Sequence, residues 1–372
     1  MGVDAARGLA LIGLMAVHVL PGRGDVTQEP TGSSLFLSGN SAALLTLLAG
    51  VGLALSCGGR FPHTGRWLAA DRVGVAVRAV LIAVVGLGIG TVMPQDGPVD
   101  SLLFSYGVLL LLAIPFLHLS AAALLACAAV FWLVGPLLVQ ALAEVLPVHV
   151  SSRAVADVVG EPGGTICQLL LSGAYPVLPY LVYLLVGLGV GRVHLREKAV
   201  QIRLLVVGAA LVVFAQATSS VVDSAFGGYG RLSQTRGMSQ DELGEALVRG
   251  PSSLPTDTSL AIAAGVGVGL LVLGACLLIG RKSGAWLAPL SAMGAMALSL
   301  YTAHLVAVSL GVGYNLPYTW VVLHLGAAAW CALAWQRALG QGPLERVVST
   351  SVGTARRTVL HRPHRNHWLY QQ

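Results

Sequence analysis

Charged side chains are scarce in this sequence. They make up 10% of the 372 residues, whereas hydrophobic residues make up 55%, and the mean hydropathy is +0.78. Soluble domains usually carry about 25% charged residues. A water-exposed surface cannot be built from this composition, but a lipid-exposed one can, because lipid requires apolar side chains. The composition therefore excludes an ordinary soluble protein and predicts an integral membrane protein.

The cysteines and the basic residues lack the patterns of two other classes of site. No C-x-x-C pair occurs, and most of the cysteines lie within or beside apolar runs, so we interpret them as small packing residues. The net charge of +6 forms no basic stripe with an aromatic platform, so nucleic acid is not an expected partner. Neither a metal nor a bound cofactor is expected. The five cysteines are Cys57, Cys127, Cys167, Cys276 and Cys331.

The sequence does have apolar runs of bilayer-spanning length. A transmembrane helix needs about 20 mainly apolar residues, and ten runs come close to this length. We predict an all-α integral membrane protein with about ten transmembrane helices. The runs lie near residues 4–21, 35–57, 73–93, 102–117, 119–142, 166–191, 203–222, 258–280, 286–311 and 318–336.

The charges between these runs predict the orientation. If the ten helices alternate in direction, 17 of the 22 basic residues fall on one side of the membrane and 12 of the 16 acidic residues on the other. Cytoplasmic loops carry an excess of lysine and arginine. Both ends of the chain are therefore predicted to lie in the cytoplasm.

Two segments are predicted to be more than simple connections. Residues 223–257 form a long external loop in the predicted topology, where Ser239 to Glu242 resemble a capping box that begins a short helix ending near Val248. Residues 1–340 are predicted to form one membrane domain. Residues 341–372 are predicted to form a basic cytoplasmic tail at the membrane surface.

The first apolar run carries the leading candidates for chemistry. Arg7 and His18 are eleven positions apart, which places both on one helix face about 16 Å apart along the axis, with Asp4 close to the same face. An arginine at the inner boundary can bind the phosphates of a cytoplasmic donor. A histidine in the outer half can act as a general base or carry an acyl group. The alternative is that Arg7 only follows the positive-inside rule and His18 only bonds a neighbouring helix.

A second polar cluster lies in the ninth run. Tyr301 and His304 are three positions apart and share a helix face with each other. Counted from Trp286 at about 1.5 Å per residue, His304 would lie about 27 Å along a continuous helix, at a depth similar to that of His18. We predict His18, His304 and Tyr301 as catalytic residues, and Arg7 and Asp4 as donor-binding residues. The alternative is an interfacial tyrosine and a packed histidine.

The sequence also resembles a known family in several segments that follow in order along the chain. They look like the YeiB-like membrane family, which is related to heparan-alpha-glucosaminide N-acetyltransferase, and the Arg-x10-His spacing is similar to that of acyltransferase-3 membrane enzymes. The segments are DAARGLALIGLMAVH from Asp4, GNSAALLTLLAGVGLAL from Gly39, SYGVLLLLAIPFL from Ser105, GAYPVLPYLVYLLVGLGVGR from Gly173, ALSLYTAH ending at His304, and GPLE from Gly342.

The resemblance implies an acyltransferase-like bundle in the bacterial cytoplasmic membrane. By analogy, it implies transfer of an acyl group, such as acetyl, from cytoplasmic acyl-CoA to a hydroxyl or amine of an envelope glycan or lipid. Asn40, Ser41, Tyr106 and Tyr175 are further candidates for an acceptor site or cavity. The chain departs from its relatives at Asn40, where they often have arginine, and at residues 255–259, where PTDTS replaces a His-Ser-Gly run.

Other functions stay open at this point. A transporter or flippase for a lipid or small solute is the main alternative, although none of the acidic residues lies in the interior of a predicted span, so a carboxylate proton relay is not expected. A structural subunit of an envelope complex is a third hypothesis. The expected partners are membrane lipid, acyl-CoA and the acceptor, and a homo-oligomer is left open.

Overall fold

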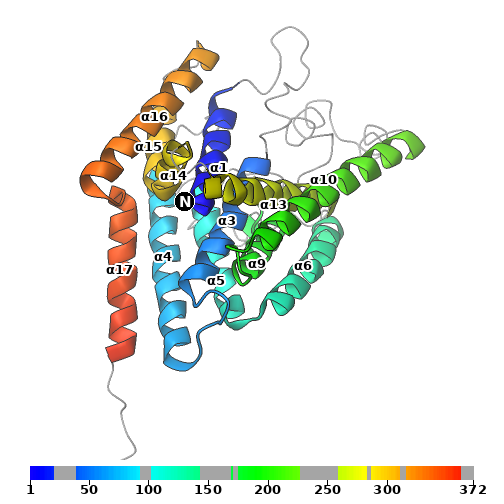
Figure 1. The fold of residues 1–372 in the computed structure, drawn as a ribbon, viewed down its shortest axis with the longest axis horizontal. Coiled ribbons are helices and arrows are strands. Elements are labelled where there is room, and N and C mark those ends of the chain that lie inside the picture. The colour runs from blue at the N-terminus through cyan, green and yellow to red at the C-terminus, as the bar shows by residue number, and fades with distance from the viewer. Residues whose placement is uncertain are drawn as a thin grey trace, which may run out of the picture.

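The computed structural model describes residues 1–20, 39–92, 102–142, 169–170, 175–226, 259–282, 286–310 and 316–361. Within these ranges the elements are helical and no strand occurs (Figure 1). Most of the predicted external loop, with its capping box, lies outside the described residues. The helices are α1 Gly2–Val19, α3 Asn40–Ser56, α4 Gly65–Val92, α5 Leu102–Ala113, η1 Ile114–His118, α6 Ala121–Leu142, α9 Val177–Gly191, α10 Lys198–Phe226, α13 Ser259–Lys282, α14 Ala288–Ala295, α15 Ala297–Ser309, α16 Pro317–Leu339 and α17 Pro343–His361.

Each of the ten predicted runs coincides with an apolar helix or helix pair, but the helices differ in length. Five are long and apolar enough to cross a membrane, namely α1, α4, α10, α13 and α16, and the α14–α15 pair would make a sixth. The remaining four are shorter apolar stretches, namely α3, α5 with η1, residues Ala121–Gly135 of α6, and α9. The all-helical, multi-pass membrane architecture is therefore present, with five or six helices of spanning length in the described part of the chain.

The ninth run is not the continuous helix that we predicted from 286–311. It is broken at Met296, and α14 and α15 meet there at an angle of 79°. The axial position that we predicted for His304, counted along one straight helix from Trp286, is therefore wrong. Broken helices in membranes need other groups to bond the freed backbone, and such groups are present at this break, as described below.

Glycines bring the central helices into close contact. A Cβ atom placed on Gly294 of α14 would overlap the carbonyl oxygen of Asp4, and one placed on Gly8 of α1 would overlap that of Leu290. Small residues at helix interfaces in membranes allow this approach of backbones. As a result, α1 lies directly against α14 and, beyond the break, against α15 (Figure 1).

One buried arginine joins three turns that are distant in sequence. Arg192, at the end of α9, donates hydrogen bonds to the carbonyl oxygens of Cys57 at 3.0 Å, Gly59 at 2.7 Å and Leu117 at 2.6 Å. Burial lowers the pKa of Arg192 from its ordinary value, but a guanidinium stays protonated in proteins. The α3–α4, η1–α6 and α9–α10 turns therefore lie together on one side of the bundle.

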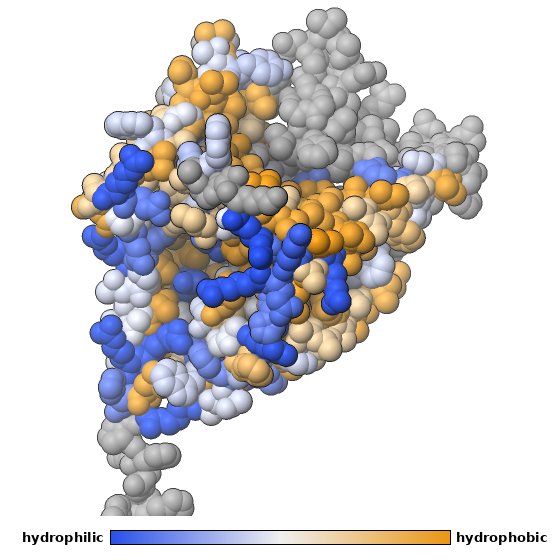
Figure 2. All heavy atoms as spheres, in the orientation of Figure 1, coloured by the Kyte–Doolittle hydropathy of each residue, from blue (hydrophilic) through white to orange (hydrophobic). Residues whose placement is uncertain are grey.

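The helix α17, within the segment 341–372, lies along α4 (Figure 1). Arg356 of α17 pairs with the buried carboxylate of Asp71 on α4 at 2.5 Å, and His63 contacts the other oxygen of Asp71 at 2.7 Å. Arg66 donates to the carbonyl oxygen of Leu360 at 2.6 Å. Polar groups thus attach α17 to the charged first half of α4. Figure 2 shows hydrophilic side chains gathered over this part of the molecule, beside the apolar surface of the bundle.

The glycine contact between α1 and α14 gives a first testable prediction. Gly294→Ala should lower stability by about 1–3 kcal/mol, because the added methyl group overlaps a backbone carbonyl that cannot rotate away. Thermal unfolding in detergent, followed by size-exclusion chromatography, measures the effect. Gly326→Ala is the matched control, since no described atom lies within 4 Å of a Cβ there. Equal melting temperatures for the two variants would contradict the close packing.

Candidate active site

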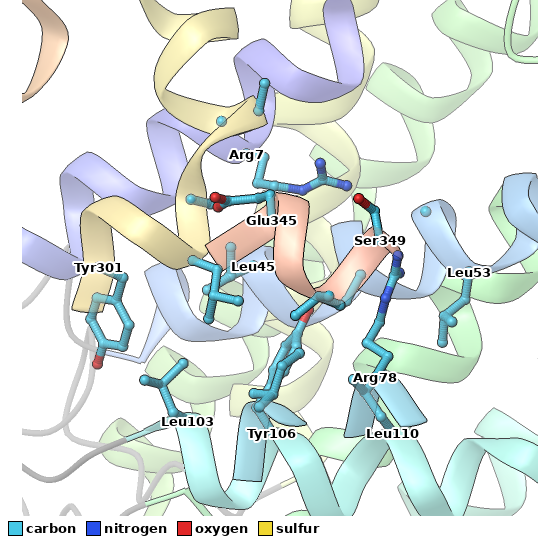
Figure 3. A pocket seen from close by; sticks show the side chains of 18 of the residues that line it. Arg7, Leu45, Leu53, Arg78, Leu103, Tyr106, Leu110, Tyr301, Glu345 and Ser349 are labelled. Atoms are coloured by element: carbon cyan, nitrogen blue, oxygen red, sulfur yellow. The ribbon is translucent and has the colours of Figure 1, made fainter. Parts of the chain in front are cut away.

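The helices α1, α3, α4, α5, α14, α15 and α17 contribute to a cavity of about 320 Å³ (Figure 3). This volume is within the range of small-ligand pockets. Most of its wall is apolar, and leucines from α3 and α5 form much of it. The polar groups come from α1, α4, α5, α15 and α17, so residues from both ends of the chain meet here.

Two arginines line the cavity. Arg7 of α1 and Arg78 of α4 extend their guanidinium groups toward Ser349 of α17 (Figure 3). Arg7 has Asp4 at 3.5 Å, whereas no carboxylate pairs with Arg78 among the described residues. The cavity therefore holds two guanidinium groups together with the carboxylate of Glu345, which bonds Ser299, so Arg78 is the cation there without a carboxylate partner among the described residues. Gly52 leaves room for Arg7, since a Cβ there would lie 3.1 Å from its Nη2 atom.

Tyr301 connects the cavity with two histidines. Its side chain lines the cavity on the side away from Arg78 (Figure 3). Its ring centroid lies 6.0 Å from that of His18 and 6.3 Å from that of His304. Nδ1 of His18 and Nε2 of His304 are 3.2 Å apart, within hydrogen-bond distance. The three residues that we predicted as catalytic thus lie together, although they come from α1 and α15.

His304 and Tyr301 are shielded from solvent, whereas His18 is half-buried. His304 is 1% exposed and Tyr301 is 2% exposed, so Tyr301 is not the interfacial anchor that the alternative interpretation required. Nε2 of His18 is buried and has no hydrogen-bond partner among the described residues. A buried polar atom without a partner is unfavourable. His18 and His304 do not themselves line the cavity and are connected with it through the ring of Tyr301.

A third histidine extends the cluster. Nδ1 of His304 lies 3.0 Å from Nε2 of His324, which belongs to α16. The ring of His324 also lies 5.4 Å from that of Trp320. Both ring nitrogens of His304 are thus used in contacts with other imidazoles.

A carboxylate from α17 binds the beginning of α15. Glu345 accepts hydrogen bonds from the backbone N–H of Ser299 at 3.0 Å and from the Ser299 hydroxyl. The N–H of Leu344 donates to the same hydroxyl oxygen at 3.1 Å. A carboxylate stabilises a helix N-terminus by accepting from its free N–H groups and by opposing its dipole. Glu345 therefore bonds the backbone freed by the break at Met296 and fixes the helix that carries Tyr301 and His304.

The other predicted candidates are placed less centrally. Asp4 contacts Arg7 but does not itself line the cavity, and Tyr106 lines it between Leu103 and Leu110 (Figure 3). Tyr175 lines a separate space of about 10 Å³ together with Tyr106. Asn40 and Ser41 begin α3 and line neither space. Their roles toward an acceptor stay predictions.

Sequence reasoning missed three residues of this site. Arg78 was counted only as one of the cytoplasmic basic residues, although it is the last charge before the apolar part of α4. His324 is the single histidine or charged residue inside the run 318–336, and this position alone would have marked it as a functional candidate. Glu345 lies in the GPLE segment, whose role depends on a contact that spacing does not reveal.

The family of the chain follows from a comparison with protein families. The family model for the catalytic region of heparan-alpha-glucosaminide N-acetyltransferase matches residues 1–218, which is more than half of the chain. This chain belongs to the heparan-alpha-glucosaminide N-acetyltransferase family. No curated protein matches it. The predicted relation to this family is confirmed, whereas the similarity to acyltransferase-3 enzymes stays a prediction.

Membership of this acetyltransferase family, together with the apolar helices, makes the chain a multi-pass membrane protein related to transferases. The matched region contains Arg7, His18, Arg78 and Tyr106. The remainder supplies Tyr301, His304, His324 and Glu345 to the same site. The site is therefore assembled from the matched and unmatched parts of the chain.

The contact between Glu345 and α15 gives a second prediction. Glu345→Ala should lower stability by about 0.5–2 kcal/mol, the usual effect of losing a helix cap. Glu345→Gln should lower it less, because an amide oxygen still accepts from the N–H of Ser299. Thermal unfolding of the purified protein measures both. Glu197→Ala is the control, since Glu197 is 60% exposed between α9 and α10. A Glu345→Ala variant as stable as this control would contradict the capping role.

Proposed function

We propose that the protein transfers an acetyl group from acetyl-CoA to a hydroxyl or amine of a glycan or lipid in the cell envelope. One observation carries the proposal: a single cavity joins two arginines, Arg7 and Arg78, to Tyr301 and, through it, to His18 and His304. The family match supports acetyl as the group transferred, and its name supports an amino sugar as one class of acceptor.

The arginines suit the donor. Acetyl-CoA carries phosphates, which a guanidinium binds through paired hydrogen bonds. A cavity of about 320 Å³ is too small for the whole molecule, so the adenosine would stay outside while phosphate reaches the two arginines and the pantetheine arm extends toward Tyr301. The mainly apolar wall suits an uncharged thioester and its pantetheine arm. Ser349 lies beside both guanidinium groups and offers a hydroxyl to the same ligand (Figure 3).

Donor binding gives a third prediction. Arg7→Ala should weaken acetyl-CoA binding by about 10–100-fold, because a hydrogen bond to a charged group contributes about 1.5–3 kcal/mol. Arg7→Lys should restore binding only partly, since lysine lacks the planar fork. Calorimetric titration with acetyl-CoA measures both.

Arg72→Ala is the control for donor binding. Arg72 lies on α4, as the cavity-lining Arg78 does, but it is exposed and does not line the cavity. Arg7→Ala with wild-type affinity would remove this role. A wild-type protein that does not bind acetyl-CoA would contradict the proposal and favour a transporter.

The histidines suit the chemistry. Nε2 of His18 would take the proton of the acceptor hydroxyl or amine while its oxygen or nitrogen attacks the thioester carbonyl carbon. The new carbon–oxygen or carbon–nitrogen bond forms as the carbon–sulfur bond breaks. CoA leaves as the thiolate and receives the proton back from the imidazolium. Contact with His304 holds the ring of His18 in place during these steps.

His18 gives a fourth prediction. His18→Ala and His18→Gln should both lower the rate of acetyl transfer by about 10²–10⁴-fold, because neither side chain can take up and return a proton near neutral pH. Donor binding and thermal stability of His18→Gln should stay close to wild type. The rate is measured with labelled acetyl-CoA and glucosamine as the acceptor probe. An active His18→Gln enzyme would rule out the catalytic role.

The proposed orientation places the donor in the cytoplasm and the acceptor at the outer face of a bacterial cytoplasmic membrane. Ten alternating spans place the α3–α4, η1–α6 and α9–α10 turns on the cytoplasmic side. The bonds of Arg192 to the first two of these turns support this arrangement, since they require the three turns to lie together. Both chain ends would then be cytoplasmic, and the α17 helix would lie beside the donor entrance.

A further inference from the structure

The hydrogen-bond chain of His18, His304 and His324 has a direction that bears on the proposed chemistry. A neutral imidazole carries one N–H group and one acceptor nitrogen. His304 contacts His18 through Nε2 at 3.2 Å and His324 through Nδ1 at 3.0 Å. It must therefore donate to one neighbour and accept from the other. When all three rings are neutral, their protons are consequently ordered in one of two directions.

The two directions leave the free nitrogen of His18 in different states. If His18 donates to His304 and His304 donates to His324, then Nε2 of His18 carries a lone pair. If the order is reversed, Nε2 carries a proton. Only the first state can accept a proton from a substrate.

Burial favours the first direction. Nε2 of His18 is buried without a partner among the described residues. Buried N–H groups without an acceptor are rarer in proteins than acceptors without a donor. The first direction leaves an unpaired acceptor at this position, and it requires His324 to accept from His304. His324, the last of the three histidines, is only part-buried.

We propose that His324 is a positioning residue that fixes the direction of this chain, so that His18 presents the lone pair of Nε2 to the acceptor substrate. The proposal rests on the proposed function for the identity of the reaction. It makes α16, which lies outside the region matched by the family model, part of the catalytic machinery. His324 acts through His304 and His18 and does not itself touch the substrate.

The test compares two substitutions of His324 in the full-length protein. His324→Gln offers an amide oxygen that accepts from Nδ1 of His304, so kcat for acetyl transfer to glucosamine should stay within about 3-fold of wild type. His324→Phe keeps a ring beside Trp320 but has no acceptor, so His18 should divide between two tautomers and kcat should fall at least about 10-fold. The KM for acetyl-CoA should not change in either variant. Val322→Ala, at an exposed position of the same helix, is the control.

A second readout does not depend on activity. Nitrogen NMR of histidine-labelled protein distinguishes the two tautomers, and the His18 signals are assigned by their loss in His18→Gln. The wild type should show His18 protonated at Nδ1, and His324→Phe should show a mixture of the Nδ1–H and Nε2–H tautomers of neutral His18. Unchanged His18 signals in His324→Phe would overturn the proposal, and so would a kcat of His324→Phe equal to that of the wild type. A His324→Gln variant as slow as His324→Phe would overturn it too. A wild type that transfers no acetyl group would overturn the proposed function, and the NMR result would still decide the role of His324.

Discussion

Close contact between α1 and the broken α14–α15 pair is the constraint on which the site depends. Gly8 and Gly294 let the two backbones approach without side chains between them. This approach leaves the side chain of His18 within hydrogen-bond distance of His304 and keeps Arg7 on the wall of the same cavity. Larger residues at these two glycines would separate the helices, and the histidine contact, 3.2 Å long, would not survive such a shift.

The break at Met296 has a consequence that reaches the end of the chain. A helix N-terminus inside a membrane protein has free N–H groups that lipid cannot bond. In this molecule Glu345 of α17 bonds one of them, the N–H of Ser299, while Arg356 and Asp71 attach α17 to α4. The helix that carries His304 is therefore held by groups on the charged side of the bundle. The contacts of α17 thus connect the cavity and the helix break with α4.

Hydropathy and charge predicted the positions of the ten apolar helices because both reflect how each segment meets lipid or water. The depth predicted for His304 assumed a straight ninth helix and was wrong in that premise, although His18 and His304 do lie in contact. The break could not be predicted, since its partner lies almost 50 residues further on. The position of His324 inside an apolar run could have marked it as a candidate, but its contact with His304 could not be predicted from the sequence.

The division of the site between the matched and unmatched parts of the chain bears on how function is inherited in this family. Residues 1–218 bring the two arginines and His18, to which the proposed function assigns the donor phosphates and the base. His304, which contacts His18, and His324, which contacts His304, lie beyond the match. Under the proposed function, a relative that kept the first part and changed these two histidines would keep donor binding while losing the ordered base. The proposal thus makes donor binding and catalysis separable, because different segments of the chain supply the arginines and the two outer histidines.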